Sequence, residues 1–151
     1  SATELVSLLN QIFGRFDQLT VQHGVEKIKT IGDGYMVVCG IPKPDSRHAH
    51  RIIDLAQDML LVMNEFEGLS IRIGINTGTV IAGIIGQTRI AFDLWGRAVN
   101  IASRMESHGE NGRIQVTEDT YSLLRGEYQF DAPRIIDVKG KGEMRVFFLA
   151  N

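Results

Sequence analysis

Two segments rich in apolar residues, 25–31 and 35–41, are separated by only three residues. So short a connection excludes a crossover between parallel strands, and the two segments must pair as an antiparallel hairpin. Asp33-Gly34 is among the dipeptides that most favour a tight hairpin turn, so we place the turn there. Near the end of the chain, segments 134–138 and 144–149 flank a short glycine-rich connection in the same way. A sheet built from such hairpins is mostly antiparallel.

Helical periodicity occupies much of the remaining chain. In residues 1–23, apolar side chains recur every three or four positions, and Ser1 with Glu4 forms the pattern of a capping box. Gly24 is suited to end this helix. The same spacing predicts a second helix with Ser46 as its N-cap. Two further helices are predicted, over residues 96–108 and from Thr117 to residue 124.

The other predicted strands are short. Residues 70–76 alternate between apolar and polar side chains, as in a half-buried strand, and the apolar run 80–85 is typical of a central strand. Residues 86–92 are predicted to form a surface turn, and residues 114–116 a short strand. Strands and helices therefore interleave, and we expect an α+β fold with helices packed on a mostly antiparallel sheet.

Size and composition limit the class of protein. The chain has 151 residues, 44% of them hydrophobic, which suits one domain over residues 1–151. A net charge of −2 argues against nucleic-acid binding by charge. No apolar run approaches the roughly 20 residues of a membrane span. The lone Cys39 favours a reducing compartment. We expect a cytoplasmic location and no membrane contact from this segment, whether or not the parent protein carries membrane or sensor domains.

Two candidate residues belong to the first hairpin. Asp33 at its tip could present a carboxylate to a hard cation such as Mg²⁺, although Asp-Gly is also good turn chemistry. Strand alternation places Lys27 and Lys29 on one face, opposite Ile28. Lys29 is then either a solvated lysine or a donor to a ring nitrogen or a phosphate. Local sequence leaves both alternatives open.

Further candidates lie in the second half. Asn100 and Arg104 are four residues apart, so they share a helix face and are either a surface pair or a site for a hydroxyl-bearing, phosphorylated ligand. Asp93 lies two residues before the only tryptophan and could cap the helix or accept from an exocyclic amine. Lys139 and Lys141 alternate with glycines, which would let the amines reach phosphate, but this pattern alone is weak.

Taken together, three ordered motifs resemble the class III nucleotidyl cyclase catalytic domain. KIKTIGDGYM at 27–36 resembles the metal motif of that family, and FDLWG at 92–96 followed by VNIASRM at 99–105 resembles its purine and transition-state motif. VKGKG at 138–142 resembles its phosphate lysine motif. The likeness covers the whole chain. It implies a ferredoxin-like α+β core and a head-to-tail homodimer, with active sites shared between two copies of the chain.

The resemblance also implies residue roles. Asp33 of one subunit would bind two catalytic Mg²⁺ or Mn²⁺ ions. The other subunit would read the base with Lys29 and Asp93, orient the ribose with Asn100 and stabilise the transition state with Arg104. Lys139 would hold the terminal phosphates.

The donor and acceptor pattern selects the base. Lys29 donates and Asp93 accepts, which matches N1 and the 6-amino group of adenine. In guanylyl members the corresponding positions resemble Glu and Cys. The sequence therefore predicts an adenylyl cyclase, which converts ATP to 3′,5′-cyclic AMP and pyrophosphate by attack of the ribose 3′-oxygen on the α-phosphorus.

One element of the family pattern has no counterpart. The other metal carboxylate of the family lies on a first strand, ahead of the helix that begins at Ser1, and we expect the domain to be truncated there. Two alternatives to an adenylyl cyclase follow. A noncatalytic dimerising or regulatory module would explain the missing carboxylate, whereas a guanylyl cyclase conflicts with both base-reading residues.

Overall fold

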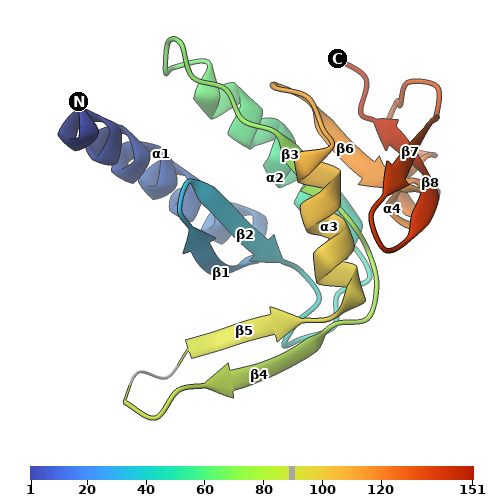
Figure 1. Ribbon diagram of the computed structural model, residues 1–151, viewed down its shortest axis with the longest axis horizontal. Helices are drawn as coiled ribbons and strands as arrows, with labels where there is room; N and C mark the ends of the chain where they lie inside the picture. The colour runs from blue at the N-terminus through green and yellow to red at the C-terminus, as the bar shows by residue number, and fades with distance from the viewer. Residues whose placement is uncertain (89–90) are drawn as a thin grey trace. The chain divides into compact units, whose positions relative to one another are not determined.

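A computed structural model describes residues 1–88 and 91–151. The chain forms two compact units, residues 1–69 and 70–151, and each is described by itself. The order of helices and strands is shown in Figure 1. In the described part of the chain, no helix is long and apolar enough to cross a bilayer.

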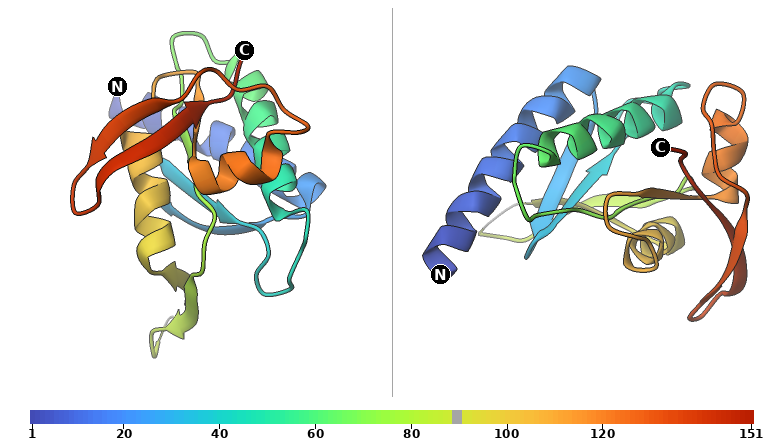
Figure 2. Two further views of the ribbon diagram at one scale, coloured as in Figure 1. Left: turned by 90° about the vertical axis from the view of Figure 1, so that its right-hand side faces the viewer. Right: turned by 90° about the horizontal axis from the view of Figure 1, so that it is seen from above.

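The first unit contains two helices and a hairpin (Figures 1 and 2). Helix α1 spans Ala2–His23, begins with the predicted Ser1–Glu4 capping box and ends at Gly24, whose φ is 69°. Helix α2 spans His48–Met63 and packs along α1. Its N-cap is Arg47, which makes no side-chain capping bond, so the prediction that Ser46 caps this helix is wrong.

The hairpin of this unit pairs β1 (Glu26–Ile31) with β2 (Gly34–Val38). Ile31 pairs with Gly34, so the two-residue loop is Gly32-Asp33 and not the predicted Asp33-Gly34. Only the first loop position, Gly32, has a positive φ, 59°. This pattern is that of a type II′ turn, which requires glycine at its first position.

The second unit is built on a four-stranded sheet in the order β3-β6-β8-β7. The strands are β3 (Ile73–Ile75), β6 (Ile114–Thr117), β7 (Arg134–Val138) and β8 (Gly142–Phe148). Two of the three pairings are antiparallel, and β3 pairs with β6 in parallel. A parallel pair needs a crossover, which here includes helix α3 (Arg97–Ser107). A short helix, α4 (Glu118–Leu124), begins at the predicted Thr117 cap.

A separate ribbon in this unit pairs β4 (Ile81–Ile85) with β5 (Ala91–Trp95). The prediction that 80–85 forms a central strand is wrong. Strand β4 pairs only with β5 among the described residues, and Ile81 and Ile84 are largely exposed. Of the turn predicted over 86–92, residues 89–90 lie outside the described residues and β5 begins at Ala91. The α+β fold with mainly antiparallel pairing is confirmed.

Candidate active site

Helix α3 presents two polar side chains beside its buried face. Ile101 and Met105 are buried against Val138 of β7 and Val146 of β8. Because residues four apart lie on one helix face, this packing fixes the rotation of α3. Each of the two buried residues is preceded by a polar one, Asn100 or Arg104, and both of these side chains are exposed. The apolar packing of α3 therefore aims Asn100 and Arg104 along one edge of the helix.

The β7–β8 hairpin brings two lysines to the same region. Its loop is held by a bond from Lys141 N to Val138 O of 2.8 Å, and Gly140 and Gly142 both have φ near 80°. Residues other than glycine rarely adopt that conformation, so the loop accounts for the two glycines but does not require the lysines. Lys139 is exposed and Lys141 is partly exposed.

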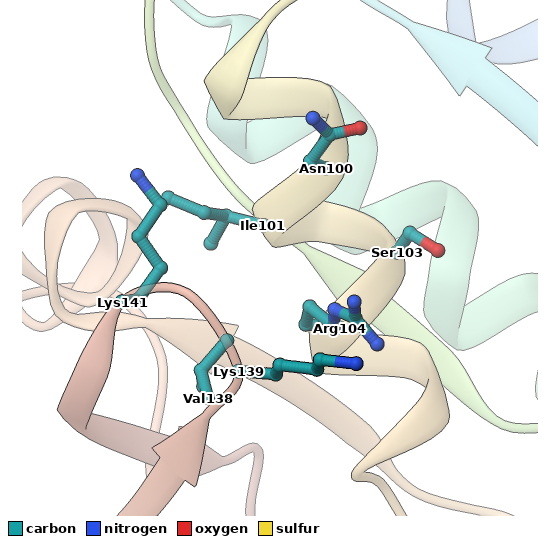
Figure 3. Close-up of a pocket in the computed structure, with 7 residues that line it drawn as sticks. All are labelled: Asn100, Ile101, Ser103, Arg104, Val138, Lys139 and Lys141. Atoms are coloured by element: carbon teal, nitrogen blue, oxygen red, sulfur yellow. The ribbon is translucent and has the colours of Figure 1, made fainter.

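These two elements enclose a pocket of about 390 Å³. Figure 3 shows Lys139 extending toward Arg104 of α3, with Asn100 farther along the helix. The lining residues are Asn100, Ile101, Ser103, Arg104, Val138, Lys139 and Lys141. Within the described part of the chain, Arg104, Lys139 and Lys141 form no ion pair with a carboxylate. Three uncompensated cations beside an amide and a hydroxyl are suited to bind a polyphosphate that carries a sugar hydroxyl.

The structure brings together three of the six predicted site residues, Asn100, Arg104 and Lys139. It also adds Ser103, which our sequence reasoning missed. Ser103 lies three residues after Asn100, so helical spacing could have identified it. Asp93 is not among the lining residues. Lys29 and Asp33 belong to the other unit and are described within it.

Asp93 is a buried carboxylate on β5, with 7% of its surface exposed. Its Oδ1 accepts a hydrogen bond of 2.8 Å from Leu94 N. The helix that follows has Gly96 as its N-cap, so Asp93 does not cap it. A carboxylate accepts hydrogen bonds and does not donate them, which makes Asp93 suited to accept from a ligand amine.

Asp33 occupies the second position of the two-residue loop and is exposed. Among the described residues, no group of three or more His, Cys, Asp or Glu side chains could hold a metal ion. Mg²⁺ in nucleotide enzymes is usually bound by one or two carboxylates plus substrate phosphates, and a lone carboxylate on a tight hairpin fits that mode.

Lys29 is repositioned by a bulge that the sequence did not reveal. Lys27 pairs with Val37, but Lys29 pairs with Met36, so Ile28 is an extra residue in β1. Since Val37 and Met36 face opposite sides of the ribbon, Lys27 and Lys29 do too. The prediction that the two lysines share a face is therefore wrong.

The other face of the hairpin is fastened to α1. Tyr35 donates to Asp17 Oδ1 at 2.6 Å, and Lys27 Nζ lies 3.0 Å from the same oxygen. The Tyr35 ring packs on Phe13 and Phe16 of α1. Burial, and then the bond to Asp17, raises the pKa of Tyr35 far above its usual range. Burial also acts to raise the pKa of Asp17, but the bonds from Tyr35 and Lys27 outweigh it and lower that pKa. This network leaves Lys29 on the opposite face of the hairpin.

Comparison with characterised sequences gives close relatives of both substrate types. An adenylate cyclase of Mycobacterium tuberculosis is 42% identical over 151 residues, covering 97% of this chain and 34% of the relative. A membrane guanylyl cyclase of Dictyostelium discoideum is 43% identical over 149 residues, covering 99% of this chain and 10% of the relative. The chain thus spans about a third or less of these two proteins.

Comparison with solved structures gives the same fold. The guanylate cyclase domain of RhGC from Catenaria anguillulae, crystallised in complex with GTP, superimposes with a TM-score of 0.94 at 34% identity. The match covers 99% of this chain and 85% of that domain. Residues 1–151 also match the family described as the adenylate and guanylate cyclase catalytic domain. The chain belongs to this family, the class III nucleotidyl cyclases.

Proposed function

We propose that the chain is an adenylyl cyclase catalytic domain that converts ATP to 3′,5′-cyclic AMP and pyrophosphate. The observation that carries the proposal is that Asn100, Arg104 and Lys139 line the same pocket. Asn100 would hold the ribose, with its amide fixing the hydroxyl that attacks. Lys139 would bind the terminal phosphates, and Arg104 would stabilise the charge that develops on the α-phosphate.

Base selection is assigned to Lys29 and Asp93. A lysine only donates and a carboxylate only accepts, which matches N1 and the 6-amino group of adenine. Guanine presents O6 as an acceptor and N1–H as a donor. Because an unpaired buried polar group costs about 1–3 kcal/mol, each mismatch with guanine would weaken binding by roughly five- to 150-fold.

Asp33 is the residue proposed to hold Mg²⁺ or Mn²⁺, together with phosphate oxygens of the substrate. The chemistry that two such ions supply when bound is a lower pKa of the 3′-hydroxyl and neutralisation of phosphate charge. The tight loop fixes the backbone on both sides of Asp33 and so orients its carboxylate.

A second copy of the chain is the proposed partner, in a head-to-tail homodimer. The β4–β5 ribbon supports this, because Ile81, Ile84, Ile85 and Trp95 all expose much of their side chains. A ribbon of adjoining exposed apolar side chains is typical of a protein interface. In the dimer, Asp33 of one copy would meet the pocket of the other.

The base assignment is tested by exchanging its two residues. We expect Lys29→Glu combined with Asp93→Cys to shift the ratio of dissociation constants for ATP and GTP toward GTP by at least tenfold. Isothermal titration with each nucleotide measures this without requiring turnover. The matched control is Lys43→Glu, which makes the same charge reversal at an exposed lysine outside the hairpin. An unchanged preference in the double variant would refute the assignment.

A noncatalytic nucleotide-binding module is the second candidate, because the three cations that line the pocket could bind a polyphosphate without any catalytic metal. Chromatographic detection of cyclic AMP from ATP separates the candidates, because a noncatalytic module would bind ATP without releasing pyrophosphate.

A further inference from the structure

The C-terminal end of α3 is satisfied by side chains from the sheet. The last carbonyls of a helix have no partner within the helix. Here Met105 O accepts a hydrogen bond of 3.0 Å from Gln115 Nε2 of β6. His108 O, at the C-cap, accepts one of 2.8 Å from Arg134 Nη2 of β7. Two strands of the sheet, β6 and β7, which lie on either side of β8, thus each hold this end of the helix.

Gln115 and Arg134 are also bonded to each other. Gln115 is fully buried, and its Oε1 accepts from Arg134 Nη2 at 2.7 Å and from Nε at 3.2 Å. The Arg134 guanidinium lies 4.5 Å from the ring of Phe148, which holds its plane. A buried amide is costly unless it is bonded, and here both ends of the Gln115 side chain are bonded.

This link joins the two walls of the pocket. Helix α3 carries Arg104, one residue before Met105, and β7 ends at Val138, one residue before Lys139. We propose that Gln115 and Arg134 are positioning residues that set the spacing of Arg104 and Lys139 for a polyphosphate. Apolar packing between α3 and the hairpin holds the walls together, whereas directional bonds resist sliding of the helix along the sheet. The inference rests on the proposed function of the pocket.

The test measures binding of inorganic pyrophosphate to the purified chain by isothermal titration. Gln115→Met removes the bond to Met105 and the two bonds from Arg134 at nearly constant volume and charge. Arg134→Lys keeps the positive charge, but lysine lacks the planar guanidinium group that bonds Gln115 and His108 at the same time. We expect each variant to bind pyrophosphate about tenfold more weakly, since small displacements of binding groups are costly. The two substitutions break the same link, so their effects should not multiply. We expect the double variant to lose about as much pyrophosphate affinity as one single variant does, and no more than the product of the two single losses.

Arg113→Lys is the matched control. Arg113 also lies over the Phe148 ring, at 4.7 Å, but it bonds Asp131 and Leu149 O and makes no bond to α3. Its variant should lose stability as Arg134→Lys does, yet bind pyrophosphate within about twofold of the parent chain. Circular dichroism at the titration temperature establishes that each variant is folded, and Arg134→Lys alone decides if Gln115→Met does not fold.

The outcomes separate the inference from the proposed function. If the parent chain binds pyrophosphate and both variants bind it as tightly as Arg113→Lys does, Gln115 and Arg134 have only a structural role and the inference is wrong. If the parent chain itself fails to bind pyrophosphate, the polyphosphate pocket of the proposed function is wrong, and the inference is overturned together with it.

Discussion

Arg104 occupies an exposed position, where its charged side chain stays hydrated and pays little free energy of desolvation. It is exposed on α3, while the neighbouring Met105 is fully buried and fixes the helix beneath it. Lys139 lines the same pocket, so the two cations repel each other until an anion arrives. In the proposed site, Arg104 would stabilise the charge that develops on the α-phosphate in the transition state.

Replacing Arg104 by Ala is therefore expected to lower kcat on the order of 10²-fold while changing the dissociation constant for ATP much less. Steady-state kinetics of an active form of the cyclase, with ATP titrations, measure both quantities. Arg97→Ala is the matched control, because Arg97 is an exposed arginine on the same helix that does not line the pocket. Equal losses in turnover and in binding would assign Arg104 a ground-state role instead.

At the scale of elements, the contact of α3 with β3 depends on one glycine. A Cβ on Gly74 would lie 2.1 Å from Glu106 N and 2.5 Å from Met105 C. Both atoms belong to the helix backbone, so they cannot move as a flexible side chain would. The helix lies against the strand backbone at this point, and this contact brings Met105 O within reach of Gln115.

Gly74→Ala is expected to lower the free energy of unfolding by about 3 kcal/mol, because the added methyl must displace the helix. Gly14→Ala is the control: its added methyl would meet no atom within 4 Å beyond the adjoining backbone of its own helix, and alanine favours a helix interior by about 0.5–1 kcal/mol. Urea denaturation of both variants gives the two values. A Gly74→Ala chain as stable as the parent would show that α3 can move away from β3 at little cost.

At the scale of the whole molecule, the proposed homodimer can be tested through its dependence on protein concentration. If the sites are shared, specific activity must rise with protein concentration, since a monomer holds no complete site. We expect Ile84→Lys to shift the equilibrium toward monomer, because Ile84 is 69% exposed on the β4–β5 ribbon. Sedimentation velocity over a concentration series measures the association.

Ile135→Lys is the control for this shift, because Ile135 is 59% exposed but lies on β7, outside the ribbon. It should leave association unchanged. Specific activity that is independent of concentration would contradict a shared site. If Ile84→Lys and Ile135→Lys changed self-association to the same extent, the interface would not be the β4–β5 ribbon.

Much of the fold was predictable because its signals are local. Capping residues at Ser1 and Thr117 mark helix starts, and Gly24 marks a helix end, since each acts within a few residues of its own position. The hairpins follow from short connections. The spacing of Asn100 and Arg104 likewise predicted a shared helix face, and the structure places both in one pocket with Lys139.

Other features depend on how strands pair, which the residue pattern of a single strand does not reveal. The bulge at Ile28 depends on how β1 pairs with β2, and it turns Lys29 away from Lys27. The turn register follows from the positive φ of Gly32, although Asp33-Gly34 offered an equally good local choice. The exposure of β4 follows from its pairing with β5 instead of with a strand of the four-stranded sheet. The apolar sequence of residues 80–85 does not show which strand will be its partner.

The sequence by itself determined the helices, the first and last hairpins and the ordered motifs, because periodicity, caps and short connections are properties of neighbouring residues. Only the tertiary structure decided that α3 lies against the β7–β8 hairpin, so that three cations enclose one pocket, and that Gln115 and Arg134 connect its walls. Those arrangements depend on burial and on hydrogen bonds between segments that meet only when the chain is folded.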